Sequence, residues 1–411
     1  MRARGAPLGS GFARLWTASA ATNVGDGVAL AAGPLLLASL TSDPALVAGA
    51  VFAQQLPWLL FALPAGVLVD RIDRRKLVVL VNLVRAAVIG ALAAAVATGS
   101  ASVALIYVAL FAVGTMETLA DSASTALLPA LVPPDQLPRA NARLVGVHIV
   151  GNQLLAPPLG AALFVLAAAI PFGLNAATFL IGAVLIATLR IPRPEPRSEP
   201  HAPLRRDVTT GMRALMRHPV LRMLAICLSL MNLTLMGTFS ILVLYARERL
   251  GLDEVGFGLL LAASAVGGVA GSAASARLQE RFGVAGLLRA GLVIETCTHL
   301  SLALARAPWV AITTMVVFGA HASVWGVLTL SWRQRAVPDA LRGRVNSVYF
   351  LFAIGGAAIG ALVGGLTAGG LGITAPFWLA FGGMSVLTVV AWRRFTPARL
   401  DDPDPVPIPA S

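Results

Sequence analysis

Four long stretches of the chain contain no Asp, Glu, Lys or Arg: 45–69, 86–116, 144–189 and 345–392. An α-helix needs about 20 apolar residues to cross the hydrocarbon core of a bilayer. Of the 411 residues, 57% are hydrophobic and only 12% are charged, whereas a soluble protein of this length needs more polar residues to cover its core. The sequence therefore predicts an all-α, multi-pass protein of the cell membrane, in contact with the lipid bilayer.

Turn residues and charges divide the chain into twelve candidate spans. They lie at about 14–40, 45–69, 77–98, 102–130, 139–168, 172–190, 220–246, 254–278, 285–305, 309–333, 343–368 and 373–394. The first span is too long for a signal peptide, so we expect it to be retained. A polar segment rich in Pro and Arg separates the first six spans from the last six.

We therefore predict four parts. They are an N-terminal six-helix half at 1–190, a cytoplasmic linker at 191–219 with an interfacial helix over Val208–Met216, a C-terminal six-helix half at 220–395, and a disordered cytoplasmic tail at 396–411.

The basic residues are distributed unevenly between the two sides of the membrane. With both termini in the cytoplasm, 27 of the 31 Lys and Arg residues fall in cytoplasmic segments. Only Arg247, Arg249 and Arg306 fall outside, and Arg85 lies within the third span. This asymmetry follows the positive-inside rule. The net charge of +12 therefore reflects topology, and we predict no nucleic-acid partner.

The two halves of the chain repeat each other at their loops. Asp43 precedes Asp70 by 27 residues, and Asp253 precedes Glu280 by the same interval. The segment PDQLPRAN in the first half is matched by PDALRGRVN in the second. The pattern indicates a duplication, with two parallel six-helix halves related by an axis along the membrane normal.

The segment GVLVDRIDRRKL, at 66–77, gathers charge between two apolar spans. Arginines there fix topology, but acids contribute little to it. Asp70, at the end of an apolar run, needs cationic partners or a helix N-terminus. Gly66, one turn earlier, permits a neighbouring backbone to approach closely.

This segment resembles motif A of the major facilitator superfamily. The matching residues are Gly66, Leu68, Asp70, Arg71, Arg74 and Arg75, and Asp73 replaces the usual glycine. The resemblance implies a transporter in which Asp70 latches one conformation, with Arg74 and Arg75 as ion-pair partners. The alternative is that the segment only fixes topology.

The energy source is predicted to be an ion gradient. A P-loop needs a Gly-Lys pair, but the one lysine, Lys76, follows Arg75. We therefore expect a secondary transporter that binds a small-molecule substrate and protons and acts as a monomer. We expect no enzyme activity, metal site or cofactor.

Acids within spans are costly and are functional candidates by default. Asp26 lies in the first span, and Glu117 and Asp121 lie one turn apart in the fourth. In the major facilitator fold these spans line the central cavity, so the three acids are our proton-coupling candidates. Arg85 could instead neutralise Asp121 in a structural ion pair.

The second half contains a further acid, Glu295, one turn before His299. We expect these two residues to form a structural pair, because the ninth span lies outside the cavity in this fold. The substrate-cavity candidates are Asn23, Asn232, His321 and Trp325. His321 is equally consistent with a proton site or with a satisfied interior histidine.

The fifth span contains Pro157, Pro158 and Gly160, which predict a kink. Its sequence resembles the Gly- and Pro-rich motif C of drug/proton antiporters. The whole chain most resembles the siderophore- and macrolide-exporter branch of the superfamily. This implies proton-coupled efflux of amphipathic drugs or secondary metabolites by an antiporter of the multidrug-resistance type. The alternatives are an importer of a small nutrient or metabolite, and a receptor or lipid scramblase on the same scaffold.

Overall fold

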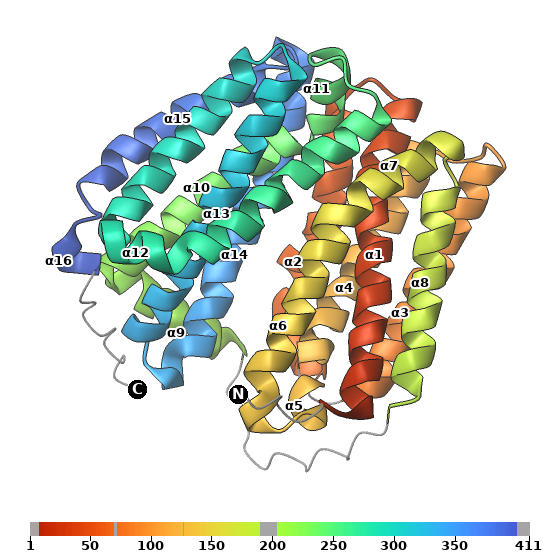
Figure 1. Cartoon of the computed structure of the whole chain (residues 1–411), viewed down its shortest axis with the longest axis horizontal. Coiled ribbons are helices and arrows are strands. Elements are labelled where there is room, and N and C mark those ends of the chain that lie inside the picture. Colours follow the sequence, from red (N-terminus) through yellow and green to blue (C-terminus); the bar gives the residue numbers. More distant parts are fainter. Residues whose placement is uncertain (1–7, 70–71, 126, 190–203, 401–411) are drawn as a thin grey trace, which may run out of the picture. The chain divides into compact units, whose positions relative to one another are not determined.

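The computed structural model describes residues 8–69, 72–125, 127–189 and 204–400, and these residues form helices and turns without any β-strand (Figure 1). The longer helices are α1 (Gly9–Leu40), α2 (Pro44–Val69), α3 (Arg74–Ala97), α4 (Val103–Thr125), α6 (Leu137–Val147), α7 (Ala156–Leu166), α8 (Ile170–Ala187), α9 (Leu204–Arg217), α10 (Pro219–Phe239), α12 (Glu254–Leu304), α13 (Pro308–Ala336), α14 (Asp339–Leu371) and α15 (Ala375–Trp392). The shorter elements are α5 (Leu128–Leu131), the 3₁₀-helix η1 (Pro134–Gln136), the π-helix η2 (His148–Leu155), α11 (Leu242–Glu248) and α16 (Pro397–Leu400).

Eleven helical segments in the described part of the chain are long and apolar enough to cross a membrane. The 51 residues of α12 include two predicted spans, 254–278 and 285–305. Gly283, between them, has φ 68° and ψ 166°, which is not helical and is accessible to glycine. A continuous helix of this length would measure roughly 75 Å, far more than a bilayer. The count of twelve and the cytoplasmic position of both termini remain predictions.

Two compact units make up the chain. Unit 1 contains Met1–Leu37 and Leu60–Glu199, and unit 2 contains Ala38–Leu59 and Pro200–Ser411. The sequence did not predict that the first part of α2 groups with unit 2. The four predicted parts and their boundaries remain predictions.

In unit 1, α1 packs closely against the fifth predicted span. A side chain at Gly27 would collide with the backbone of Asn152, and one at Gly160 with the backbone of Val28. Glycine is therefore required at both positions for the two helices to approach each other.

In unit 2, α10 and α14 cross along a glycine stripe. Gly356, Gly360 and Gly364 recur at every fourth residue of α14, and a Cβ atom at each would collide with the α10 backbone. The α10 residues in contact are Ser229, Leu233 and Gly237, respectively. Helix α9, at the place of the predicted interfacial helix, buries Ala214 and Leu215 in the core of the same unit.

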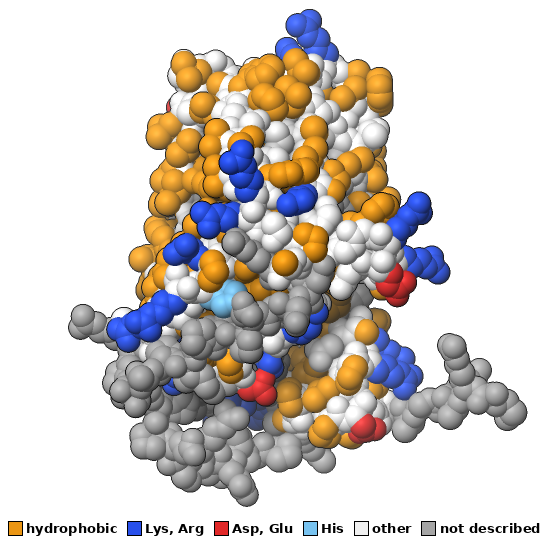
Figure 2. Space-filling view, turned by 90° about the vertical axis from the view of Figure 1, so that its left-hand side faces the viewer, with side chains coloured by type: hydrophobic (Ala, Val, Ile, Leu, Met, Phe, Trp, Pro, Cys, Tyr) orange, Lys and Arg blue, Asp and Glu red, His pale blue; other side chains and the backbone are white. Residues whose placement is uncertain are grey.

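Large apolar side chains are exposed on the outer surface. On α15, Val386 and Val389 are 66% and 71% exposed. Figure 2 shows one face on which hydrophobic side chains cover much of the upper part, with Lys and Arg side chains at its top edge and across its middle and lower parts. An apolar surface of this kind is suited to lipid rather than to water.

We predict that Gly360→Ala lowers the stability of the detergent-purified protein by about 1–3 kcal/mol, because the added methyl group overpacks the contact with Leu233. Gly355 is the matched control, since a Cβ atom there meets nothing within 4 Å. Gly355→Ala should leave the melting temperature unchanged or raise it slightly, because alanine favours the helix. Equal melting temperatures for the two variants would contradict the requirement for glycine at 360.

Candidate functional site

An ion pair and a further acid, from three helices, lie near one another in unit 1. Arg85 on α3 lies with its Nη2 atom 3.8 Å from Oε1 of Glu117 on α4. The Arg85 side chain is buried, and its guanidinium lies 4.9 Å from the centre of the Phe179 ring. Asp26 on α1 interacts electrostatically with both Arg85 and Glu117. The group therefore carries one negative charge when all three residues are ionised.

The proton-coupling candidates are only partly described by the structure. Asp26 and Glu117 belong to this charged group. No spacing in the sequence predicted that these two residues lie near each other. The side chain of Asp121 lies outside the described residues, so its pairing with Arg85 remains a prediction. Arg85 does neutralise an acid of α4, and the partner that the structure describes is Glu117.

The resemblance to motif A falls at the junction of α2 and α3. Gly66 lies within α2, whereas Asp70 and Arg71 lie outside the described residues, so the latch remains a prediction. Asp73, which replaces the usual glycine, caps α3: its Oδ1 accepts hydrogen bonds from the backbone N–H groups of Arg75 (3.0 Å) and Lys76 (3.2 Å).

The arginines of this junction also hold the end of another helix. Arg74 is the first residue of α3. Arg75 donates from Nη1 to the carbonyl oxygen of Leu189 at 2.9 Å, just beyond the C-terminus of α8. Arg14 donates to the carbonyl oxygen of Thr188 at the same distance. Cations at a helix C-terminus neutralise its exposed carbonyls and dipole, so Arg14 and Arg75 anchor α8.

A π-helix precedes the two prolines of the fifth predicted span. It covers His148–Leu155, and Pro157 and Pro158 follow within the first turn of α7. Proline provides no backbone N–H, so the preceding carbonyls cannot all complete α-helical bonds. The π-helix lies where the sequence predicts a kink, and Gly160 lies in the contact with α1.

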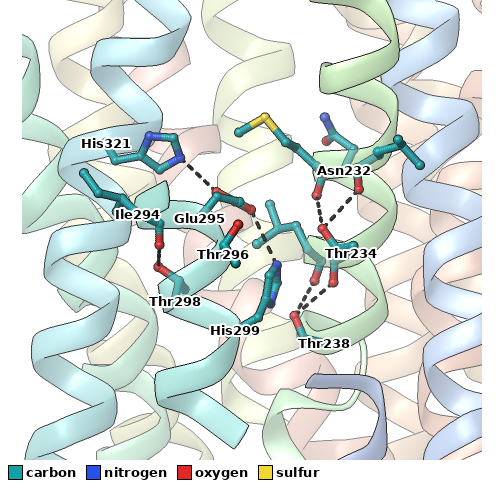
Figure 3. Close-up of polar contacts among 12 residues, drawn as sticks. Asn232, Thr234, Thr238, Ile294, Glu295, Thr296, Thr298, His299 and His321 are labelled. Atoms are coloured by element: carbon teal, nitrogen blue, oxygen red, sulfur yellow. Dashed lines mark hydrogen bonds and ion pairs between the residues drawn. The ribbon is translucent and has the colours of Figure 1, made fainter. Parts of the chain in front are cut away.

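A buried cluster of titratable side chains lies in unit 2 (Figure 3). Glu295 on α12 accepts a hydrogen bond from Nε2 of His321 on α13, with 2.9 Å between Oε2 and Nε2. Its other oxygen, Oε1, lies 3.6 Å from Nε2 of His299, one turn further along α12. All three side chains are no more than 2% exposed. The sequence paired Glu295 with His299 only, whereas the fold adds His321.

Glu295 also borders a pocket formed within unit 2. The pocket has a volume of about 680 Å³ and lies between α10, α12, α13 and α14. Its lining is mostly apolar and includes four aromatic side chains: Phe318, Trp325, Tyr349 and Phe350. This size and lining suit a drug-sized organic molecule.

Few polar groups face this pocket. Arg333 donates from Nη1 to Oδ1 of Asn346 at 3.0 Å, and its guanidinium lies 3.8 Å from the centre of the Tyr349 ring. The indole N–H of Trp325 is buried and has no hydrogen-bond partner among the described residues. Asn232 lines the pocket and donates to the Leu228 carbonyl of its own helix.

The cavity candidates are thus divided between the units. Asn232 and Trp325 line the pocket, whereas His321 lies behind it, bonded to Glu295. Asn23 lies in unit 1, where its Oδ1 is 2.9 Å from Nδ1 of His148. Sequence reasoning missed Arg333, because it read the arginines after the tenth span as topological signals only.

Comparison with known proteins identifies relatives of the chain. The model of the transmembrane secretion effector family matches residues 4–406. The enterobactin exporter EntS of Escherichia coli O1:K1 / APEC is 26% identical over 348 residues, which cover 80% of each chain. EntS of Shigella boydii serotype 18 is 26% identical over 343 residues, with the same coverage.

Solved transporter structures share the fold. A mutant of the nucleoside transporter NupG superposes with a TM-score of 0.78 at 11% identity, over 94% of this chain and 100% of that chain. A bacterial homologue of the iron transporter ferroportin in the inward-facing state superposes with a TM-score of 0.73 at 18% identity, over 94% and 98%. At these identities the likeness concerns the fold alone.

We predict that Arg85→Leu destabilises the protein by about 1–3 kcal/mol, because it leaves Glu117 without its cation; this range allows for the partial exposure of the carboxylate. The double variant Arg85→Leu/Glu117→Leu should recover part of that loss. Unfolding in mixed detergent micelles would give the coupling between the two sites. Strictly additive effects of the two substitutions would contradict an interaction at 3.8 Å.

Proposed function

Because the chain belongs to the transmembrane secretion effector family of major facilitator transporters, we propose that it exports amphipathic organic molecules by alternating access. The protein is a multi-pass membrane transporter rather than an enzyme. The relatives named as enterobactin exporters support export as the direction of transport.

The pocket of unit 2 is the observation that carries this proposal. Its aromatic and aliphatic lining favours a molecule with a large apolar surface. Glu295, Arg333 and the free indole N–H of Trp325 provide a few polar contacts that can orient such a molecule. A strongly polar nutrient would leave most of its hydrogen-bonding groups unpaired against this lining.

A proton gradient is the proposed driving force. The charged group of Asp26, Arg85 and Glu117 carries one net negative charge in a membrane-spanning unit. Uptake of one proton would neutralise it, which lowers the cost of moving it through a low-dielectric environment. Asp26 is the preferred proton acceptor, because the carboxylate of Glu117 lies beside the Arg85 guanidinium. Asp121 remains a third candidate.

The proposal includes the latch at the α2–α3 junction. Gly66, Asp70 and Arg71 would control the conformational cycle, together with Arg74 and Arg75 at the start of α3. The hydrogen bonds of Asp73 and Arg75 fix the start of α3 and connect it to the residue Leu189 beyond α8.

Transport by the purified protein in proteoliposomes would test the proposal. We predict that an imposed pH gradient drives uphill movement of ethidium or enterobactin, and that a protonophore abolishes it. Empty vesicles and vesicles without a gradient are the controls. If no amphipathic probe moves in either direction while the protein remains folded, export of this substrate class is wrong.

We predict that Asp26→Asn abolishes uphill transport and its pH dependence but preserves downhill exchange of the probe, because the neutral amide permits the conformational change without binding a proton. The matched control is Asp135→Asn, which alters an exposed acid of η1 in the same unit. Glu117→Gln and Asp121→Asn should be measured alongside. If all three variants retain protonophore-sensitive transport, coupling does not depend on the acids of unit 1.

A further inference from the structure

The pocket of unit 2 has one charged side chain of each sign on its wall. Among its lining residues only Glu295 and Arg333 are charged. Trp325, Thr329 and Arg333 line it from every fourth position of α13, so they lie on one face of that helix. Glu295 is bonded to His321 of the same helix, more than three turns before Arg333. At about 1.5 Å per residue, the two points on α13 are roughly 18 Å apart, so the opposite charges are well separated.

The two charges differ in how the fold neutralises them. Glu295 accepts a hydrogen bond from His321 (Figure 3). Arg333, by contrast, has no carboxylate within ion-pair distance in the described part of the chain. Asp339, the first residue of α14, is paired with Arg342 instead. A guanidinium without a counter-ion on the wall of an apolar pocket is costly, and an anion that enters the pocket removes that cost.

The guanidinium of Arg333 is held in a fixed position. Its Nη1 atom donates to Oδ1 of Asn346 at 3.0 Å, and its Nε atom donates to the carbonyl oxygen of Thr329 at 3.4 Å. It also lies 3.8 Å from the centre of the ring of Tyr349, which is buried. The Nη2 atom donates no hydrogen bond to any described residue. The contacts therefore fix the plane of the group while leaving donors for a ligand, so that binding an anion orders little that is not already ordered.

We propose that Arg333 binds an anionic group of the exported molecule, and that the pocket selects aromatic anions with the negative charge at one end. This inference rests on the proposed function, since it assumes that the pocket of unit 2 holds the substrate. It narrows the substrate class from amphipathic molecules in general to those that carry a carboxylate, sulfonate or phenolate. The aromatic body of such a molecule would lie against the lining rings of Trp325, Phe318 and Phe350.

The selectivity follows from the two charges on the pocket wall. A carboxylate or sulfonate at Arg333 accepts charge-assisted hydrogen bonds from the planar guanidinium, which a neutral head group cannot match. A second anionic group at the far end of the molecule would face the carboxylate of Glu295, and like charges repel strongly in a low-dielectric pocket. The arrangement therefore favours a molecule with one anionic end over its neutral analogue and over an analogue with anionic groups at both ends.

Two probes with the same aromatic body separate the anionic contact from the apolar ones. The fluorescent probe 8-anilinonaphthalene-1-sulfonate is N-phenyl-1-naphthylamine with an added sulfonate. Both are titrated into the protein in lipid nanodiscs, with empty nanodiscs as background. Arg333→Gln should raise the dissociation constant of the sulfonate by about tenfold or more and leave that of the neutral probe unchanged. The matched control is Arg335→Gln, which removes an exposed arginine from the same end of α13 that does not line the pocket; it should bind both probes as the wild type does.

A second variant keeps the test decisive if Arg333→Gln does not fold. Arg333→Lys retains the positive charge but lacks the planar fork, so it should weaken binding of the sulfonate alone, and by less than Arg333→Gln. Unchanged affinity for the sulfonate in both variants would overturn the proposal. An equal loss of the two probes, or an equal loss in Arg335→Gln, would overturn it too, because the effect would then be structural or a property of surface charge. Failure of every amphipathic probe to move in proteoliposomes, with the Arg333-dependent binding intact, would instead refute the proposed export.

Discussion

The absence of water from the hydrocarbon core is the constraint on which this structure depends. Backbone groups there must be satisfied within the chain, which leaves the helix as the repeating element. Charged side chains must likewise find partners, and two groups in the described part of the chain satisfy this requirement. Arg85 meets Glu117 in one unit, and Glu295 meets His321 in the other. Each group brings together different helices, so its charge state is coupled to how these helices pack.

The same environment explains why glycine shapes the packing. Lipid is as apolar as leucine, so helices associate through close van der Waals contact rather than through the hydrophobic effect. Gly160 in unit 1 and Gly360 in unit 2 allow helix backbones to touch. The same two helices also line the pocket, with Asn232 on α10 and Phe350 on α14. The aromatic lining and Glu295 therefore belong to one set of helices, α10, α12, α13 and α14.

The sequence by itself determined the class of the protein and the identity of its unusual residues. Long uncharged runs predict membrane helices because crossing a bilayer depends on local hydrophobicity and length alone. The charged segment at 66–77 predicted a major facilitator transporter, and the family match confirms it. Acids within apolar runs are visible without a structure because their insertion cost is local. For this reason the sequence predicts Asp26, Glu117 and Asp121 as proton-coupling candidates and Glu295 as half of a structural pair with His299.

Only the tertiary structure decided which of these residues act together. His321 lies 26 residues after Glu295, on another helix, and no helical periodicity relates them. The partnership of Arg85 with Glu117 likewise depends on how α3 packs against α4. Asp73, by contrast, caps α3 through contacts with its near neighbours in the sequence, Arg75 and Lys76. Sequence patterns show which side chains within one helix need a partner. Which helices supply those partners depends on the faces that come into contact, and these are decided by the packing of the whole unit.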